Sequence, residues 1–197
     1  MVNHSEANLW LKEVGLGTIG LVGILAGAMA LGGMMKPRIL EQQEFWVVGI
    51  EARTNNAREA TPDGVIAKQW GRLFPEGILE KIPNRTSADI LAVYTDYASD
   101  HNSDYTYILG ARVRDASTVP SGMVARKISR ARYDVFTTER GPVGKVVSEA
   151  WQEINRLADH SGLDGRRAYQ ADFEVYDQRS RDPQNSQVDI YVGVRPE

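Results

Sequence analysis

The sequence predicts an α+β fold in which duplicated β-α-β-β units form one antiparallel sheet, with two main helices on one face and a central ligand cleft. Two observations predict this fold. Strand-type and helix-type hydrophobic periodicity follow one another in the same order twice along the chain. Residues at corresponding places in the two halves are also similar, as expected of an internal repeat. Because clefts between repeats favour small-molecule sites, the cleft is expected between the two units.

The first half, residues 41–115, predicts a strand, a helix and a hairpin. The β-branched and aromatic side chains of the FWVVGIEAR stretch favour a strand. Ile66, Trp70 and Leu73 recur at helical spacing, so the following helix carries Trp70 inward. The expected elements are a strand at 45–53, a helix at 66–74, and strands at 89–97 and 105–113.

The second half, residues 120–197, repeats this order. A long amphipathic helix places Val147, Trp151 and Ile154 on one face. The expected elements are strands at 123–128 and 133–139, a helix at 143–158, and strands at 172–176 and 187–194.

Glu174 is the sharpest candidate for ligand binding. Side chains alternate along a strand, so Glu174 and Tyr176 share one face while Phe173 and Val175 take the other. We expect Phe173 and Val175 to pack under the helices, which leaves Glu174 and Tyr176 on the opposite, cleft-facing surface. A carboxylate among aromatic rings attracts an organic cation. The alternative is a solvated glutamate on an exposed strand face.

Aromatic residues that the repeat aligns complete the candidate ligand-binding set. Trp70 falls on Trp151 in the two helices, and Tyr94 falls on Tyr176 in the two middle strands. The tyrosines could wall the cleft from both sides, whereas inward tryptophans at helical spacing also suit an ordinary core. Ala92 stands where the second half has its glutamate, so the cleft is expected to be chemically lopsided.

Residues 1–35 form an apolar segment ahead of the predicted domain, residues 36–197. Residues 14–35 contain no charged side chain, and about 20 apolar residues cross a bilayer as a helix. The segment is interpreted as a membrane anchor that leaves the domain in the cytoplasm, or as translation from an upstream start codon before Met35. A cleavable signal peptide is a third interpretation, because the Ala-Met-Ala stretch at 28–30 resembles a cleavage site.

The composition excludes several classes of function. The 197 residues carry 23 Lys plus Arg against 26 Asp plus Glu, and this net charge of −3 gives no basic footprint, so no direct nucleic-acid binding is expected. The absence of cysteine excludes a disulfide scaffold, a thiolate nucleophile and zinc sites that need sulfur. His4, His101 and His160 lack the spacing of metal ligands, so we predict neither a metal site nor a cofactor.

The C-terminal residues carry a family resemblance. FEVY at 173–176 and VDIYV at 188–192, followed by Pro196, resemble the closing signature of the GyrI-like, or AraC-type, effector-binding domain family. The opening residues 35–53 are similar to the stand-alone, integron-associated branch of that family. The resemblance covers about residues 36–197 and implies a duplicated β-α-β-β fold that binds small, often cationic and lipophilic molecules.

The resemblance also implies roles for particular residues. It places the family's glutamate on Glu174 and its cleft-facing tryptophan on Trp151, so the first hypothesis is capture of a lipophilic cation in a regulatory or sequestering role. Many relatives carry a helix-turn-helix where this chain has the apolar segment, which speaks against direct transcription-factor activity. The alternatives are a hydrolase that uses Glu174 and a tyrosine as acid and base, and a DNA gyrase inhibitor-like protein-interaction role. We expect binding rather than catalysis, and we assign no catalytic residue.

Overall fold

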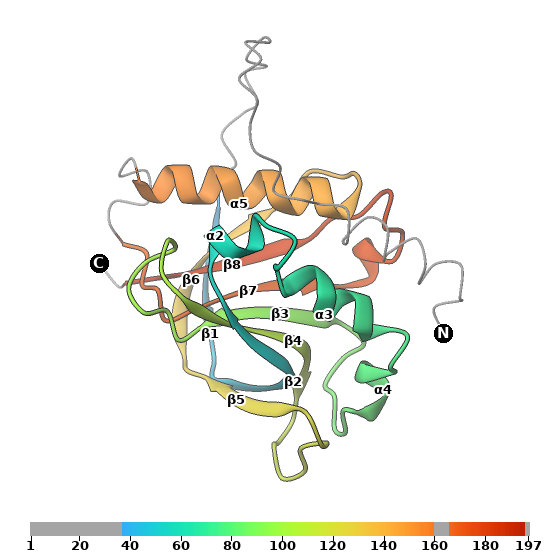
Figure 1. The fold of residues 1–197 in the computed structure, drawn as a ribbon. Helices are drawn as coiled ribbons and strands as arrows, with labels where there is room; N and C mark the ends of the chain where they lie inside the picture. The colour runs from blue at the N-terminus through green and yellow to red at the C-terminus, as the bar shows by residue number, and fades with distance from the viewer. Residues whose placement is uncertain (1–36, 160–165, 196–197) are drawn as a thin grey trace.

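Eight strands pair in one antiparallel sheet, and the helices lie over one of its faces (Figure 1). The computed structural model describes residues 37–159 and 166–195. The strands are β1 (Arg38–Gln42), β2 (Phe45–Thr54), β3 (Ile90–Thr95), β4 (Tyr105–Val113), β5 (Val124–Ile128), β6 (Ala131–Thr137), β7 (Ala171–Tyr176) and β8 (Asp189–Val194). The helices are α2 (Asn56–Glu59), α3 (Ile66–Leu73), α4 (Ile78–Lys81), α5 (Val143–Asp159) and the short 3₁₀ helix η1 (Gln178–Ser180).

The strand order, β1-β6-β8-β7-β3-β4-β2-β5, is symmetric about its centre. β3 of the first half pairs with β7 of the second half, and there Ala92 lies opposite Glu174. These are the two positions that the sequence repeat aligns, so the pseudo-twofold axis passes between them. The edge strands are exchanged between the halves, because β1 pairs with β6 and β5 pairs with β2. The predicted fold of duplicated β-α-β-β units in one antiparallel sheet is confirmed.

All the predicted strands and helices form, with ends that shift by a few residues, but the sequence analysis missed β1, α2 and α4. β1 is an edge strand whose side chains are mostly exposed, including those of Ile39 and Leu40. An edge strand with so little burial leaves no apolar alternation to detect. The helices α2 and α4 have 4 residues each, which is too short for a periodic pattern.

The face of the sheet under the helices holds the larger part of the core. α3 buries Trp70 and Leu73 against it, as the spacing predicts. α5 follows Pro142, a residue that suits the start of a helix. Its buried residues recur every three or four positions and are Val143, Val146, Ala150, Ile154 and Leu157. The two helices thus cover the same face of the sheet, one from each half, with α3 against β4 and α5 against β6 and β8 (Figure 1).

The opposite face of the sheet curls into a second core. Phe173 on β7 packs edge-on against Phe45 on β2, with ring centroids 5.3 Å apart, although β3 and β4 separate these strands in the sheet. Val175 packs on the same cluster. The prediction that Phe173 and Val175 lie under the helices is therefore wrong. Because the curled face needs apolar side chains of its own, Glu174 and Tyr176 face the helices instead.

Across residues 37–159 and 166–195, no helix is long and apolar enough to cross a lipid bilayer. The apolar segment at 1–35 lies outside the described residues. Its interpretations as an anchor, a signal peptide or the product of an upstream start codon therefore stay predictions, as do the proposed domain boundaries.

Candidate functional site

A pocket of about 280 Å³ lies between the helices and the centre of the sheet. Residues of α2 and α3 form one side, residues of α5 form the other, and strands β3, β4 and β7 contribute the floor. Both halves of the chain therefore build it, as the sequence repeat predicts. Its aromatic lining consists of Trp70, Tyr94, Tyr97, Tyr105, Trp151 and Tyr176.

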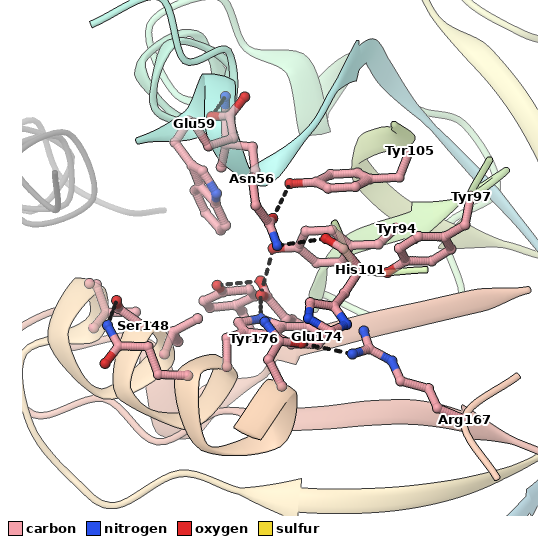
Figure 2. A pocket seen from close by; sticks show the side chains of 18 residues that line it. Asn56, Glu59, Tyr94, Tyr97, His101, Tyr105, Ser148, Arg167, Glu174 and Tyr176 are labelled. Carbon is pink, nitrogen blue, oxygen red and sulfur yellow. Dashed lines mark hydrogen bonds between the residues drawn. The ribbon is translucent and has the colours of Figure 1, made fainter. Parts of the chain in front are cut away.

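Glu174 is the buried acid at the floor of this pocket, with only 1% of its surface exposed. The Tyr94 hydroxyl and the Trp151 indole N–H donate to its Oε1 at 2.8 and 2.5 Å. The Tyr176 hydroxyl donates to its Oε2 at 2.7 Å, and these donors converge on the carboxylate in Figure 2. Both oxygens are thus fixed by the protein, and the solvated surface glutamate of the alternative interpretation is wrong.

The two tyrosines are related by the sequence repeat. Tyr94 comes from β3 and Tyr176 from β7, and they donate to different oxygens of the same carboxylate. The two tryptophans are less symmetric. Trp151 donates a hydrogen bond to Glu174, whereas Trp70 packs edge-on against the Tyr176 ring at 4.8 Å between centroids. The lopsided chemistry that the sequence predicts is therefore visible in the geometry of the site.

Burial sets the electrostatics of the carboxylate. It raises the pKa of Glu174, and the three donated hydrogen bonds oppose that shift. Within the described part of the chain, no lysine or arginine lies at ion-pair distance from this carboxylate. Burial and the nearby Glu174 charge also raise the pKa of Tyr94 and of Tyr176 well above the usual value. Both tyrosines therefore stay protonated and act as donors.

Further rings extend the aromatic wall from β3 to β4. Tyr94 lies opposite Tyr107 in the strand register, and their ring centroids are 5.2 Å apart. The ring of Tyr105 is 5.5 Å from that of Tyr94 and 5.6 Å from that of Tyr97. Edge-on and tilted contacts of this kind are favourable because the positive edge of one ring meets the negative face of another.

One end of the pocket carries a buried ion pair. The Arg167 guanidinium is bonded to Asp172 at 2.8 Å and to the Asn155 side-chain oxygen at 2.8 Å. Asp172 also accepts from the Tyr97 hydroxyl at 2.8 Å. With side chains 4% and 0% exposed, Arg167 and Asp172 neutralise each other. His101 lies beside them at the same end (Figure 2) and meets the Tyr169 hydroxyl at 3.2 Å.

A second acid in the pocket has a structural role. The Glu59 carboxylate accepts from the backbone N–H groups of Val65 and Ile66, each at 3.0 Å, and from the Thr54 hydroxyl. It thereby caps the start of α3, where Val65 offers no capping side chain. Because α3 carries Trp70, Glu59 acts as a positioning residue for the aromatic wall.

The structure brings the five residues selected from the sequence, Glu174, Trp151, Tyr176, Tyr94 and Trp70, around one pocket. The sequence analysis missed Arg167, Asn155, Tyr97, Tyr105 and His101 as lining residues. Tyr105 could have been found, because the predicted hairpin sets its strand beside Tyr94. Residues that come from loops, such as His101, give no periodic signal. No group of acids and histidines arranged to hold a metal ion occurs among residues 37–159 and 166–195.

A helix-roofed pocket on the pseudo-twofold axis of a duplicated antiparallel sheet defines the class of effector-binding domains of the GyrI-like kind. Comparison with protein families places the chain more narrowly. Residues 38–194 match the model of the integron-associated effector binding protein family, so the chain belongs to that family. The resemblance drawn from the sequence is therefore confirmed.

Two curated relatives carry the names of regulators. YobU of Bacillus subtilis strain 168, provisionally named a transcriptional regulator protein, is 31% identical over 148 residues, which are 75% of this chain and 90% of YobU. The transcriptional regulator BrlR of Pseudomonas aeruginosa is 32% identical over 163 residues, which are 81% of this chain. The match spans 56% of BrlR, so the chain accounts for about half of that protein.

Solved structures share the fold. An integron cassette protein from the mobile metagenome of Vibrio cholerae is 28% identical with a TM-score of 0.61, over 80% of this chain and 95% of that one. SAV2435, solved with tetraphenylphosphonium bound, is 19% identical with a TM-score of 0.67, over 82% of this chain and 94% of that one. At 19% identity this second likeness concerns the fold alone.

Proposed function

We propose that this protein binds a lipophilic organic cation in the pocket, with the Glu174 carboxylate as counter-ion. The rings of Trp151, Tyr94, Tyr176 and Trp70 would enclose the apolar part of the ligand. Binding would serve regulation or sequestration of the compound, and several chemically different cations would fit such a site. The names of YobU and BrlR, both regulators, support a role in responding to a small molecule.

One observation carries this proposal: a carboxylate that is 1% exposed accepts three hydrogen bonds and has no cationic partner among the described residues. Buried charges in proteins are normally paired, because burial without a partner is costly. The same chain pairs its other deeply buried pocket charge, Arg167, with Asp172. A cationic ligand would supply the partner that Glu174 lacks.

The surroundings of Glu174 favour a lipophilic cation over an inorganic one. The carboxylate oxygens already accept from Tyr94, Trp151 and Tyr176, so an ion that demands direct oxygen ligation would compete with these donors. A cation whose charge is spread over an organic framework needs only proximity to the carboxylate and contact with ring faces. The tetraphenylphosphonium bound to SAV2435, a protein of the same fold, is a cation of this kind.

Binding also accounts for the geometry better than hydrolysis. A general base needs a free lone pair within reach of its proton, and three of the roughly four acceptor positions of the Glu174 carboxylate are already taken by Tyr94, Trp151 and Tyr176. The raised pKa of Tyr94 and of Tyr176 keeps both hydroxyls protonated at neutral pH, so neither is available as a base and each is a weak acid. We therefore prefer a counter-ion role for Glu174.

Two probes of matched shape and opposite charge test the proposal. The full-length protein is titrated by calorimetry with tetraphenylphosphonium and with tetraphenylborate, which differ mainly in the sign of the charge. We expect saturable binding of the phosphonium and at least about tenfold weaker binding of the borate, since like charges across a desolvated site repel. Equal affinity for the two ions, or tighter binding of the borate, would contradict the proposal.

A further inference from the structure

A second pocket, of about 430 Å³, lies at the end of β4 and is lined by Arg112. Arg112 and Tyr107 are an odd number of positions apart on β4, so their side chains lie on opposite faces of the sheet. Tyr107 packs in the core under the helices, whereas Arg112 lies over Phe45, a residue of the second core. The Arg112 pocket is therefore separate from the Glu174 pocket. The turn between β1 and β2 forms another of its sides.

The Arg112 guanidinium is held in place but lacks an acceptor. Its central carbon lies over the Phe45 ring, 3.9 Å from the ring centroid, so the guanidinium makes a cation–π contact with that ring. The Nε atom is buried without a hydrogen-bond partner, and no carboxylate of residues 37–159 and 166–195 forms an ion pair with this side chain. Burial accordingly lowers the pKa of Arg112.

The rest of the pocket adds positive charge. Arg114 and Lys127 line it together with Arg112, and Glu44 is its one acidic lining residue. The Glu44 carboxylate lies 2.9 Å from the Lys127 ammonium group and so is already neutralised. The charged lining residues thus have a positive excess, although the protein as a whole carries a net charge of −3.

Other arginines on this side of the sheet differ from Arg112. Arg38 and Arg179 both reach Asp189, at 3.2 and 2.8 Å. Arg179 also meets Asp177 at 2.9 Å. The chain thus supplies carboxylates to the neighbouring guanidinium groups, whereas Arg112 has none among the described residues. A ligand that carries a hydrogen-bond acceptor would therefore fit there.

We propose that the Arg112 pocket binds an oxyanion, the carboxylate or phosphate group of a small molecule, on the guanidinium of Arg112. A planar guanidinium offers two parallel N–H donors that match two oxygens of such a group. The Phe45 ring lies against the guanidinium and holds it in place, and Arg114 adds attraction at longer range, whereas Lys127 is already paired with Glu44. The protein would then carry two sites of opposite charge preference on the two faces of its sheet.

Titration calorimetry of the full-length protein with phenyl phosphate and with benzoate tests this proposal and separates the two oxyanion sources. We expect Arg112→Gln to weaken binding of the preferred probe by about tenfold or more, as expected for loss of a charge-assisted hydrogen bond. Arg140→Gln removes the same charge from an exposed position outside the pocket and should leave the affinity unchanged. Glu174→Gln should also leave it unchanged, which distinguishes this site from the first pocket.

Two further measurements keep the test decisive if Arg112→Gln folds poorly. Arg112→Lys keeps the charge but lacks the planar fork, and it should weaken binding of the preferred probe. In the wild-type protein, the side-chain Nε–H resonance of Arg112 should shift on titration with that probe. Absence of binding by both probes, or binding with no response of Arg112 in the variants and the spectrum, would overturn the proposal.

Discussion

Replacement of Glu174 by glutamine removes the negative charge of the pocket while changing its shape little. The side-chain oxygen of glutamine still accepts from Tyr94 and Trp151, which both donate to Oε1. In the wild-type protein the Tyr176 hydroxyl donates to Oε2 at 2.7 Å. In the variant this hydroxyl would rotate and accept from the amide N–H group that replaces Oε2. The substitution therefore tests the charge with the hydrogen-bond network largely retained.

The magnitude follows from the burial of the carboxylate. An exposed ion pair contributes about 0–1 kcal/mol, but Glu174 is 1% exposed and lies among rings. For such a partly desolvated charge pair we expect Glu174→Gln to weaken cation binding by about 1–3 kcal/mol, or about 5- to 150-fold. A neutral ligand of similar size should lose little, because its contacts with Trp151 and Tyr176 are unchanged.

Stability should respond in the opposite direction. The pKa of Glu174 is raised in the folded protein, so the folded state binds its proton more readily than the unfolded chain does. Between the unfolded and the folded pKa, stability falls as pH rises, and at neutral pH the ionised carboxylate is a net cost to folding. Glutamine carries no such cost, and so the melting temperature should hold or increase slightly.

Calorimetric titration with tetraphenylphosphonium and with neutral triphenylphosphine oxide, together with melting curves, checks these expectations. Glu149→Gln is the matched control, because Glu149 is an exposed acid on α5 that pairs with Lys145 at 3.9 Å. It removes the same charge from an exposed position that does not line the pocket. Equal affinity of wild type and Glu174→Gln for the phosphonium would refute the counter-ion role, as would an equal loss in Glu149→Gln.

Three other predictions concern the same pocket. The charge of tetraphenylphosphonium does not titrate, so its affinity should fall as the pH drops through the raised pKa of Glu174 and should level off above that pKa. An affinity that stays unchanged down to pH 4 would contradict this. Tyr176→Phe removes a donor to the carboxylate, so the pH profile of phosphonium binding should shift to higher pH, and an unshifted profile would show that the hydrogen bond does not tune the acid. Arg167→Leu strands the buried Asp172 and should lower the free energy of unfolding in urea by about 3–5 kcal/mol, whereas Arg72→Gln in an exposed pair should change it little.

The duplicated fold and the pocket residues could be predicted because both depend on local pattern. Trp70 and Trp151 lie at helical spacing, and Glu174 lies beside Tyr176 in a strand with the alternation of a sheet. The face of the sheet to which Glu174 points could not be predicted. Alternation separates two sets of side chains, but it does not tell which set meets the helices when both faces are buried. The curled sheet buries Phe173 on the far face, so this assignment depends on tertiary structure.

The charged part of the site was hidden for a different reason. Arg167 precedes β7 and meets Asp172 at 2.8 Å, a contact that depends on the conformation of the connecting segment. Arg112 was not selected from the sequence, because its contact with Phe45 joins two strands that are far apart in sequence. Contacts of this kind carry no periodic signal, and they became evident only once the strand register was known.

The asymmetry at the centre of the repeat explains why the pocket holds a single buried carboxylate. Ala92 lies directly opposite Glu174 in the β3–β7 register. A second glutamate at that position would set two carboxylates about 5 Å apart at their Cβ atoms, and one of them would stay protonated because like charges disfavour ionisation. It would also divide the hydroxyl donors of Tyr94 and Tyr176 between two acids. With alanine there, both hydroxyls of the symmetric scaffold serve one acid and oppose the effect of burial on its pKa. The duplication thus supplies paired donors, and the departure from symmetry at a single position concentrates them on one negative charge.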